Sequence, residues 1–163
     1  MEYRIIVQDF AYRTRKNLDL LRILQAEDPE VEIYEVTQLV NSLLGLLIFP
    51  QQSYIDEIPH IPLQELKEDG WPIPRIIGEY PQVKNLNQLV RYLRNAIAHF
   101  NVHFLVDDHR QLTGIQVWNE REQRIAGGKK EKHVVWKAEI SLLELELITN
   151  KFIDLLLEKN QAG

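Results

Sequence analysis

The sequence has no cysteine, a single methionine and no long uninterrupted apolar segment. Without cysteine, the chain has no disulfide framework, no Cys-ligated zinc or iron–sulfur site and no thiol nucleophile. The longest apolar run, Leu43 to Phe49, contains Gly45 and falls far short of the roughly 20 residues that cross a membrane. The apolar stretch at the N-terminus is also too short for a signal peptide. We therefore expect a soluble, cytoplasmic protein with no membrane segment.

The chain has fewer basic than acidic residues. It contains 19 Lys and Arg and 24 Asp and Glu, which gives a formal net charge of −5. This balance argues against nonspecific binding to duplex nucleic acid, but it leaves room for a local anion site. A chain of 163 residues that is 45% hydrophobic can bury a sizeable core,. We expect one domain spanning residues 1–163.

Hydrophobic periodicity predicts a mainly α fold with four main helices and a small antiparallel β insertion before the last helix. The expected helices cover 9–25, 31–48, 85–103 and the segment that follows Ser141. Their expected N-cap residues are Asp9, Asn85 and Ser141, the last with Glu144 in a capping box.

Two segments separate these helices. A Pro-rich connector at 50–84 holds six of the seven prolines and a short helix between Pro62 and Gly70,. The β insertion spans 104–140, with strands expected at 104–107, 113–119 and 133–140 and a hairpin tip at Gly127-Gly128,.

The segment 85–103 has one face that does not belong to its core. At about 100° per residue, its apolar residues, Phe100 among them, cluster on one side, whereas Arg91, Asn95 and His99 fall on the other. Arg94 lies on the flank of that second side. Asp and Glu are absent from Pro81 to Val106. In an acidic chain this indicates an anion-facing surface, since Arg matches phosphate oxygens bidentately. An ordinary solvated helix face is the alternative.

Other candidate sites are weaker. The first helix carries four cations on its outer face, Arg13, Arg15, Lys16 and Arg22. His99 and His103 lie four residues apart, but no carboxylate accompanies them in sequence, so we expect no metal site and no cofactor. Tyr92 and Trp118 could stack on bases, although packing explains both equally simply.

The segment Arg94-Asn95-Ala96-Ile97-Ala98-His99 resembles the signature of the HEPN family (higher eukaryotes and prokaryotes nucleotide-binding), in which Arg and a polar residue precede His. The spacing here is four intervening residues. The segment from Glu35 to Pro50 and the strands after the motif also resemble a plasmid-associated bacterial HEPN subgroup.

This resemblance implies that the four main helices form an up-and-down bundle, which forms a homodimer with its motif helices facing each other. It also implies metal-independent cleavage of RNA, in a toxin or defence effector that an antitoxin protein could bind. The implied catalytic residues are Arg94, Asn95 and His99. Arg91, together with Arg13 and Asn17 of the first helix, would be substrate-binding neighbours.

The residue types suit this chemistry. A His can take or give a proton near pH 7, and an Arg can stabilise phosphoryl oxygens. One His cannot readily do both proton transfers in one pass, but a two-fold dimer supplies a second copy. The expected products are a 2′,3′-cyclic phosphate and a 5′-hydroxyl. Two alternatives stay open, an inactive HEPN module that binds nucleotide, RNA or a partner protein, and a purely structural helical dimer.

Overall fold

The computed structural model describes residues 3–28, 30, 34–48, 56, 58–124 and 128–158. The described residues form five helices, α1 (Tyr3–Glu27), α2 (Glu35–Ile48), α4 (Leu63–Glu68), α5 (Leu86–Ala98) and α6 (Leu142–Glu158). They also form four strands, β1 (Arg75–Ile76), β2 (Val102–Val106), β3 (Leu112–Arg124) and β4 (Lys130–Ser141). These strands make one antiparallel sheet in the order β1-β4-β3-β2.

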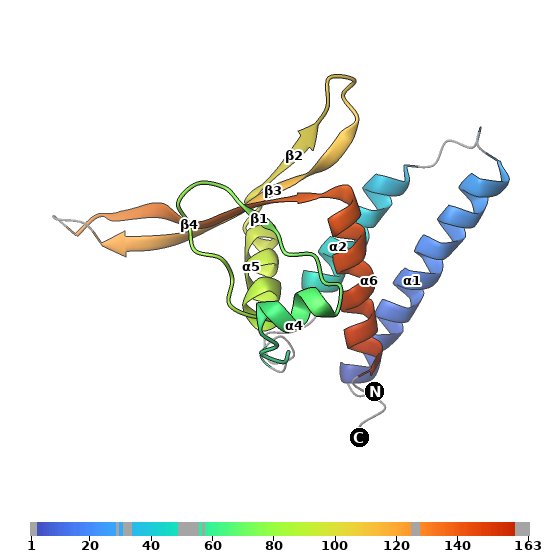
Figure 1. The fold of residues 1–163 in the computed structure, drawn as a ribbon, viewed down its shortest axis with the longest axis horizontal. Helices are drawn as coiled ribbons and strands as arrows, with labels where there is room; N and C mark the ends of the chain where they lie inside the picture. The colour runs from blue at the N-terminus through green and yellow to red at the C-terminus, as the bar shows by residue number, and fades with distance from the viewer. Residues whose placement is uncertain are drawn as a thin grey trace.

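Helices α1, α2 and α6 pack together on one side of the molecule, and the sheet lies on the other (Figure 1). Helix α5 joins the two parts because it packs against both α2 and β3. Helix α6 starts where β4 ends and contacts α1, α2 and the sheet. The outer halves of β3 and β4 extend beyond the helices as a two-stranded ribbon (Figure 1).

One continuous core holds the helices to the sheet. Trp136 of β4 and Phe152 of α6 are its largest fully buried side chains. Leucines of α2 and α5 and the alternate residues Ile115 and Val117 of β3 complete it. The connector is fastened to this core by Trp71, which is buried as its apolar character predicts,.

The predicted up-and-down bundle of four main helices with a small β insertion is wrong. The sheet has four strands and includes β1, whose Arg75 and Ile76 pair with Glu139 and Ala138 of β4. Two residues are too few to show strand periodicity, so β1 could not be predicted from the sequence. The hairpin is also longer than predicted, because polar residues beyond Asn119 continue the backbone ladder without any apolar alternation.

Several local predictions are confirmed. The Asn85 side chain accepts a hydrogen bond from the Gln88 backbone N–H at 2.9 Å, as an N-cap does,. The Ser141 backbone N–H donates to Glu144 Oε2 at 2.7 Å, and the Glu144 N–H donates to Ser141 Oγ at 3.3 Å, which forms the capping box,. Pro62 and Gly70 flank α4.

The predicted N-cap Asp9 is wrong, because α1 already begins at Tyr3. Asp9 lies inside the helix and accepts a hydrogen bond from Arg13 Nε at 2.7 Å, one turn later. For the second helix, residues 31–33 of the predicted range lie outside the described residues, and the helix begins at Glu35. The predicted hairpin tip at Gly127 also lies outside them.

Helix α5 ends at Ala98, five residues before the predicted end. Phe100 adopts a left-handed backbone with φ 60°, a conformation that costs a non-glycine residue roughly 1–2 kcal/mol. Its N–H donates to the Ile97 carbonyl at 3.0 Å, and the Asn101 N–H donates to the Ala96 carbonyl at 2.7 Å. This pair of bonds is a Schellman motif, which closes the helix and turns the chain into β2.

The sheet contains a β-bulge between its inner and outer halves. Asn119 pairs with Trp136, whereas the next residue, Glu120, pairs with Val134, so Val135 is an extra residue in β4. Bulges bend a strand and increase its local twist. The bulge therefore lies where the sheet leaves the core and the ribbon begins.

Gly114 lies where β3 passes close to the backbone at the end of β4. A Cβ atom at this position would lie 2.4 Å from the Ile140 carbonyl oxygen and 3.1 Å from the Ser141 Cα. Because both neighbours are backbone atoms, Gly114→Ala should destabilise the protein by about 1–3 kcal/mol. The corresponding drop in Tm of several degrees can be measured by thermal denaturation. Thr113→Ala, at the exposed neighbouring position, is the control; equal Tm values for the two variants would contradict the prediction.

Candidate functional site

The motif helix α5 has one buried and one exposed side. Leu89, Leu93 and Ala96 are fully buried against the core. Arg91, Asn95 and His99, spaced four residues apart, are exposed and share the other side, as the helical wheel predicts,. Arg94 is half-buried at the edge of this side. The structure therefore places all four candidates of this segment on or beside one stripe of α5.

His99 is the C-cap residue of α5, and the backbone around it is well fixed. Its N–H donates to the Asn95 carbonyl at 3.0 Å. Two residues on, the Asn101 carbonyl accepts a hydrogen bond from the Trp118 N–H of β3 at 3.2 Å. The buried Asn119 side chain also donates to the Tyr92 carbonyl of α5 at 2.9 Å. The motif helix and the hairpin are thus held in one fixed relationship.

A surface depression of about 230 Å³ lies beside His99. His99 and Asn101 form one wall, and Glu120, Glu122 and Lys132 of the ribbon form the other. The sequence does not place these carboxylates near the motif, because they lie some twenty positions away from it, between two predicted strands. The only sequence signal was the long polar stretch between two strands.

The carboxylates of the depression have partners on the ribbon. Lys130 Nζ donates to Glu122 Oε2 at 2.7 Å, and this hydrogen bond lowers the pKa of Glu122 and raises the pKa of Lys130. Glu120 Oε1 accepts a hydrogen bond from Trp118 Nε1 at 3.2 Å. Lys132 Nζ lies 3.8 Å from Glu120 Oε2. The ribbon side of the depression therefore consists of ion-paired carboxylates.

The prediction of an acid-free anion surface needs a correction. Although α5 itself carries no acid, Arg91 forms an ion pair with Asp56, a residue of the connector. Glu120 and Glu122 approach the same side from the ribbon. A count along one segment cannot see acids that the fold brings from elsewhere.

The candidates on α1 do not join the motif within one chain. Arg13 and Asn17 are exposed, and Arg13 is paired with Asp9. Helix α1 makes its main contacts with α2 and α6, whereas those of α5 are with α2 and β3. Arg13 and Asn17 therefore remain predictions only as residues that a second chain could bring near.

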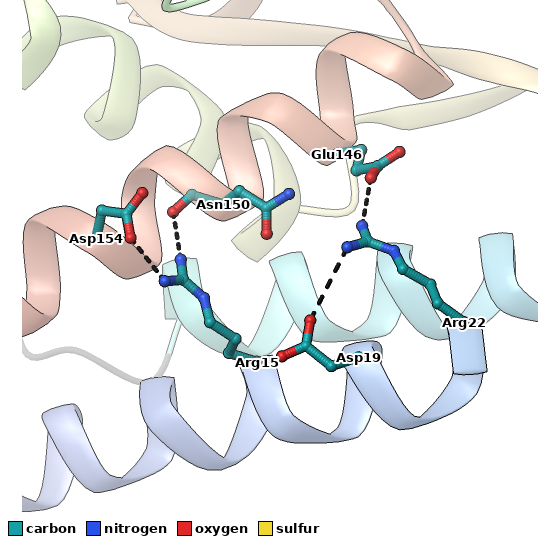
Figure 2. Close-up of polar contacts among 6 residues, drawn as sticks. All are labelled: Arg15, Asp19, Arg22, Glu146, Asn150 and Asp154. Atoms are coloured by element: carbon teal, nitrogen blue, oxygen red, sulfur yellow. Dashed lines mark hydrogen bonds and ion pairs between the residues drawn. The ribbon is translucent and has the colours of Figure 1, made fainter. Parts of the chain in front are cut away.

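Most of the other α1 cations serve the packing of α1 on α6. Arg15 donates to Asp154 at 2.7 Å and to the Asn150 carbonyl at 2.9 Å, and Arg22 pairs with Glu146 (Figure 2). Lys16 Nζ lies 5.6 Å from the centre of the Tyr12 ring. The basic stripe predicted on this helix is therefore largely neutralised inside the chain.

The rival sites are changed by the fold as well. His103 lies on β2, so His99 and His103 are not one turn apart on a helix. Among the described residues, no group of three or more His, Asp or Glu side chains is placed to hold a metal ion. Tyr92 packs edge-on against Trp136, with ring centres 5.2 Å apart, as the packing interpretation predicts. In the part of the chain that is described, no helix combines the length and apolarity that crossing a bilayer requires.

The stripe and the depression combine groups that act on phosphodiesters. An imidazole can move a proton, a guanidinium can hold phosphate oxygens, and an amide can donate a hydrogen bond. Arg94 and His99 are five residues apart, or about 7.5 Å along a helix axis. This separation suits two groups that contact different parts of a substrate.

Comparisons with known proteins support the resemblance. The family model described as HEPN pEK499 p136 matches residues 1–162. No curated protein and no solved structure gives a match. The match covers almost the whole chain, including the connector and the β hairpin. It confirms the plasmid-associated group that the segment from Glu35 to Pro50 and the strands after the motif resemble. The chain belongs to the HEPN family, in the group HEPN pEK499 p136.

Proposed function

We propose that this protein is a metal-independent endoribonuclease whose active site forms between the two chains of a homodimer. HEPN domains are often ribonucleases and often act as dimers on RNA. The observation that carries the proposal is the exposed stripe of α5, where the motif residues Asn95 and His99 lie uncovered while the opposite side of the helix is buried.

The reaction needs no group beyond those of the motif. A neutral His99 accepts the proton of the ribose 2′-hydroxyl, and the 2′-oxygen forms a bond with phosphorus. The P–O5′ bond breaks, and a protonated His99 of the second chain gives its proton to the leaving 5′-oxygen. Arg94 stabilises the charge on the phosphoryl oxygens. The products are a 2′,3′-cyclic phosphate and a 5′-hydroxyl.

The charges around His99 limit where the scissile phosphate can bind. Glu120 and Glu122 are matched by Lys132 and Lys130, so the depression offers a phosphate no net positive charge,. The phosphate therefore binds on the other side of His99, towards Asn95 and Arg94. A partner chain related by a two-fold axis would face this side with its own Arg94 and His99.

The biological role that fits this activity is a toxin or defence effector. Uncontrolled RNA cleavage is harmful to its own cell, so such an enzyme requires a protein that restrains it. An antitoxin protein that covers the α5 stripe would do so. The Asp56–Arg91 ion pair is the contact within the chain that such a partner would have to compete with or extend.

Removing the imidazole should abolish cleavage without unfolding the protein. His99→Ala should lower kcat on a fluorescent single-stranded RNA by at least about 100-fold, because it deletes the proton-transfer group. Its Tm should stay within about 2 °C of the wild type, since the side chain is exposed. His103→Ala, an exposed histidine on β2, should cleave normally. Equal loss in both histidine variants would contradict the proposal.

Replacing the guanidinium tests the phosphoryl contact separately. Arg94→Lys keeps the positive charge and most of the aliphatic packing of this half-buried residue, but it loses the planar fork that binds two oxygens. We expect kcat to fall by about 10-fold or more at an unchanged Tm. Activity equal to that of the wild type would exclude Arg94 from the phosphoryl site.

Mixed dimers test whether both chains contribute a histidine. When wild type and His99→Ala are unfolded and refolded together in equal amounts, only about one dimer in four carries two imidazoles. Cleavage per total dimer should then fall to about a quarter of the wild-type rate, rather than the half expected if each chain acts alone. Light scattering on the same sample must show a mass near twice 19.2 kDa. A rate of one half would overturn the shared site.

A further inference from the structure

Phe100 follows His99 and is almost fully exposed. Its side chain is 87% accessible, the largest value among the exposed large apolar residues in the described part of the chain. The helical wheel predicts Phe100 on the core side of α5, and this prediction is wrong because the helix ends two residues earlier. Packing within the chain therefore does not explain an aromatic residue here.

The backbone at Phe100 also favours a different residue. With φ 60°, Phe100 occupies the left-handed position of the Schellman motif, where glycine is the usual residue,. A glycine there would remove both the steric cost of the Cβ atom and the exposed ring. The left-handed backbone thus costs stability that the exposed ring does not recover by burial, which points to a role outside folding.

The backbone on both sides of Phe100 belongs to the candidate site. His99 and Asn101, on either side of it in sequence, both line the depression. The Asn101 carbonyl is held by the Trp118 N–H, and the Phe100 N–H is held by the Ile97 carbonyl. The backbone that carries the ring is therefore a hydrogen-bonded turn directly after His99.

The surroundings of the ring are polar. His99 and Asn95, near the same end of α5, are exposed, and Glu120 and Glu122 lie across the depression from His99. An exposed aromatic ring beside polar side chains suits a planar ligand that carries charge at its edge. A nucleotide has this form, since its base has two π faces and its phosphate is anionic.

We propose that Phe100 is a stacking platform for the nucleobase next to the scissile phosphate, and that it positions the RNA at His99. This inference rests on the proposed ribonuclease function. Stacking on an aromatic ring is tolerant of base identity, so Phe100 would contribute affinity and register with little sequence preference. The phosphate would lie towards Asn95 and Arg94 while the base covers the ring.

Phe100→Gly separates this role from a structural one. Because glycine suits the left-handed backbone, the variant should keep or raise its Tm by about 2–4 °C. Its KM for a single-stranded RNA should rise about 10-fold or more, with a smaller change in kcat. Phe100→Trp should restore KM, whereas Phe100→Leu, which is apolar but has no π face, should not. A lower Tm for Phe100→Gly, or full activity of Phe100→Leu, would overturn the proposal.

Arg110→Gly is the matched control. Arg110 has φ 61° in the turn between β2 and β3, so glycine relieves the same backbone conformation away from His99. This variant should gain stability in the same way and keep the wild-type KM. A rise in KM equal to that of Phe100→Gly would show that backbone relaxation, rather than loss of the ring, weakens substrate binding. This result would overturn the proposal.

An abasic substrate identifies the contacting base. RNA with one abasic nucleotide beside the cleaved bond should bind His99→Ala about 10-fold more weakly than intact RNA, and the His99→Ala, Phe100→Gly double variant should not discriminate between them. Equal discrimination by both variants would overturn the stacking contact while leaving the ribonuclease function intact. A wild type that neither binds nor cleaves RNA would overturn both. If Phe100→Gly instead turns the dimer into a monomer by light scattering, the ring contacts the second chain and the stacking proposal fails.

Discussion

The burial of one side of α5 against α2 and the sheet determines where every motif residue lies. Leu86, Leu89 and Leu93 are fully buried, and each such side chain contributes about 1.5–3 kcal/mol by leaving water. A rotation of the helix that covered His99 or Asn95 would expose these leucines and bury polar groups without partners. The apolar residues therefore orient the motif as firmly as any direct contact to it. The buried Asn119 side chain extends the same constraint to the hairpin through its bond to the Tyr92 carbonyl.

Cations near the candidate site and on α1 form ion pairs with acidic side chains. Arg91 is paired with Asp56, Arg15 with Asp154, and Lys130 with Glu122. In a chain of net charge −5 these pairs leave little bulk positive potential to attract RNA,. Recognition must then depend on a few positioned groups at short range. An imidazole, a guanidinium at the helix edge and an exposed ring form such a set, and their contacts are less sensitive to salt than a broad basic patch would be.

The parts of the fold that the sequence predicts are those with a local cause. The caps at Asn85 and Ser141, the helix between Pro62 and Gly70 and the outward side of α5 all follow from residues close in sequence. The sheet order and β1 do not, because they depend on pairing between residues 64 positions apart, such as Arg75 and Glu139. The end of α5 was missed for another reason. Phe100 and Phe104 continue the apolar period, so periodicity predicts that the helix continues through them. The left-handed backbone at Phe100, which ends the helix, cannot be recognised from such a period.

The candidate site divides in the same way. The motif on α5 is contiguous, so its residues could be found from the sequence alone, and the family assignment agrees with it. Glu120, Glu122 and Lys132 come to the same depression only through the folding of the hairpin. Asp56 reaches Arg91 across 35 positions. Charge arguments made on one segment are therefore the least secure part of a sequence interpretation, since an ion pair depends on distance in space.

The bulge at Val135 divides the long hairpin into two parts with different structural roles. On the inner side, Trp136, Ala138 and Ile140 alternate into the core and tolerate little change. On the outer side the strands pair only with each other, and their side chains face solvent or His99. The extra residue Val135 thus sets the direction of the outer strands without altering the pairing of the inner ones. Evolution can lengthen, shorten or recharge the outer part, and so reshape the surroundings of the histidine, while the domain behind it keeps its architecture.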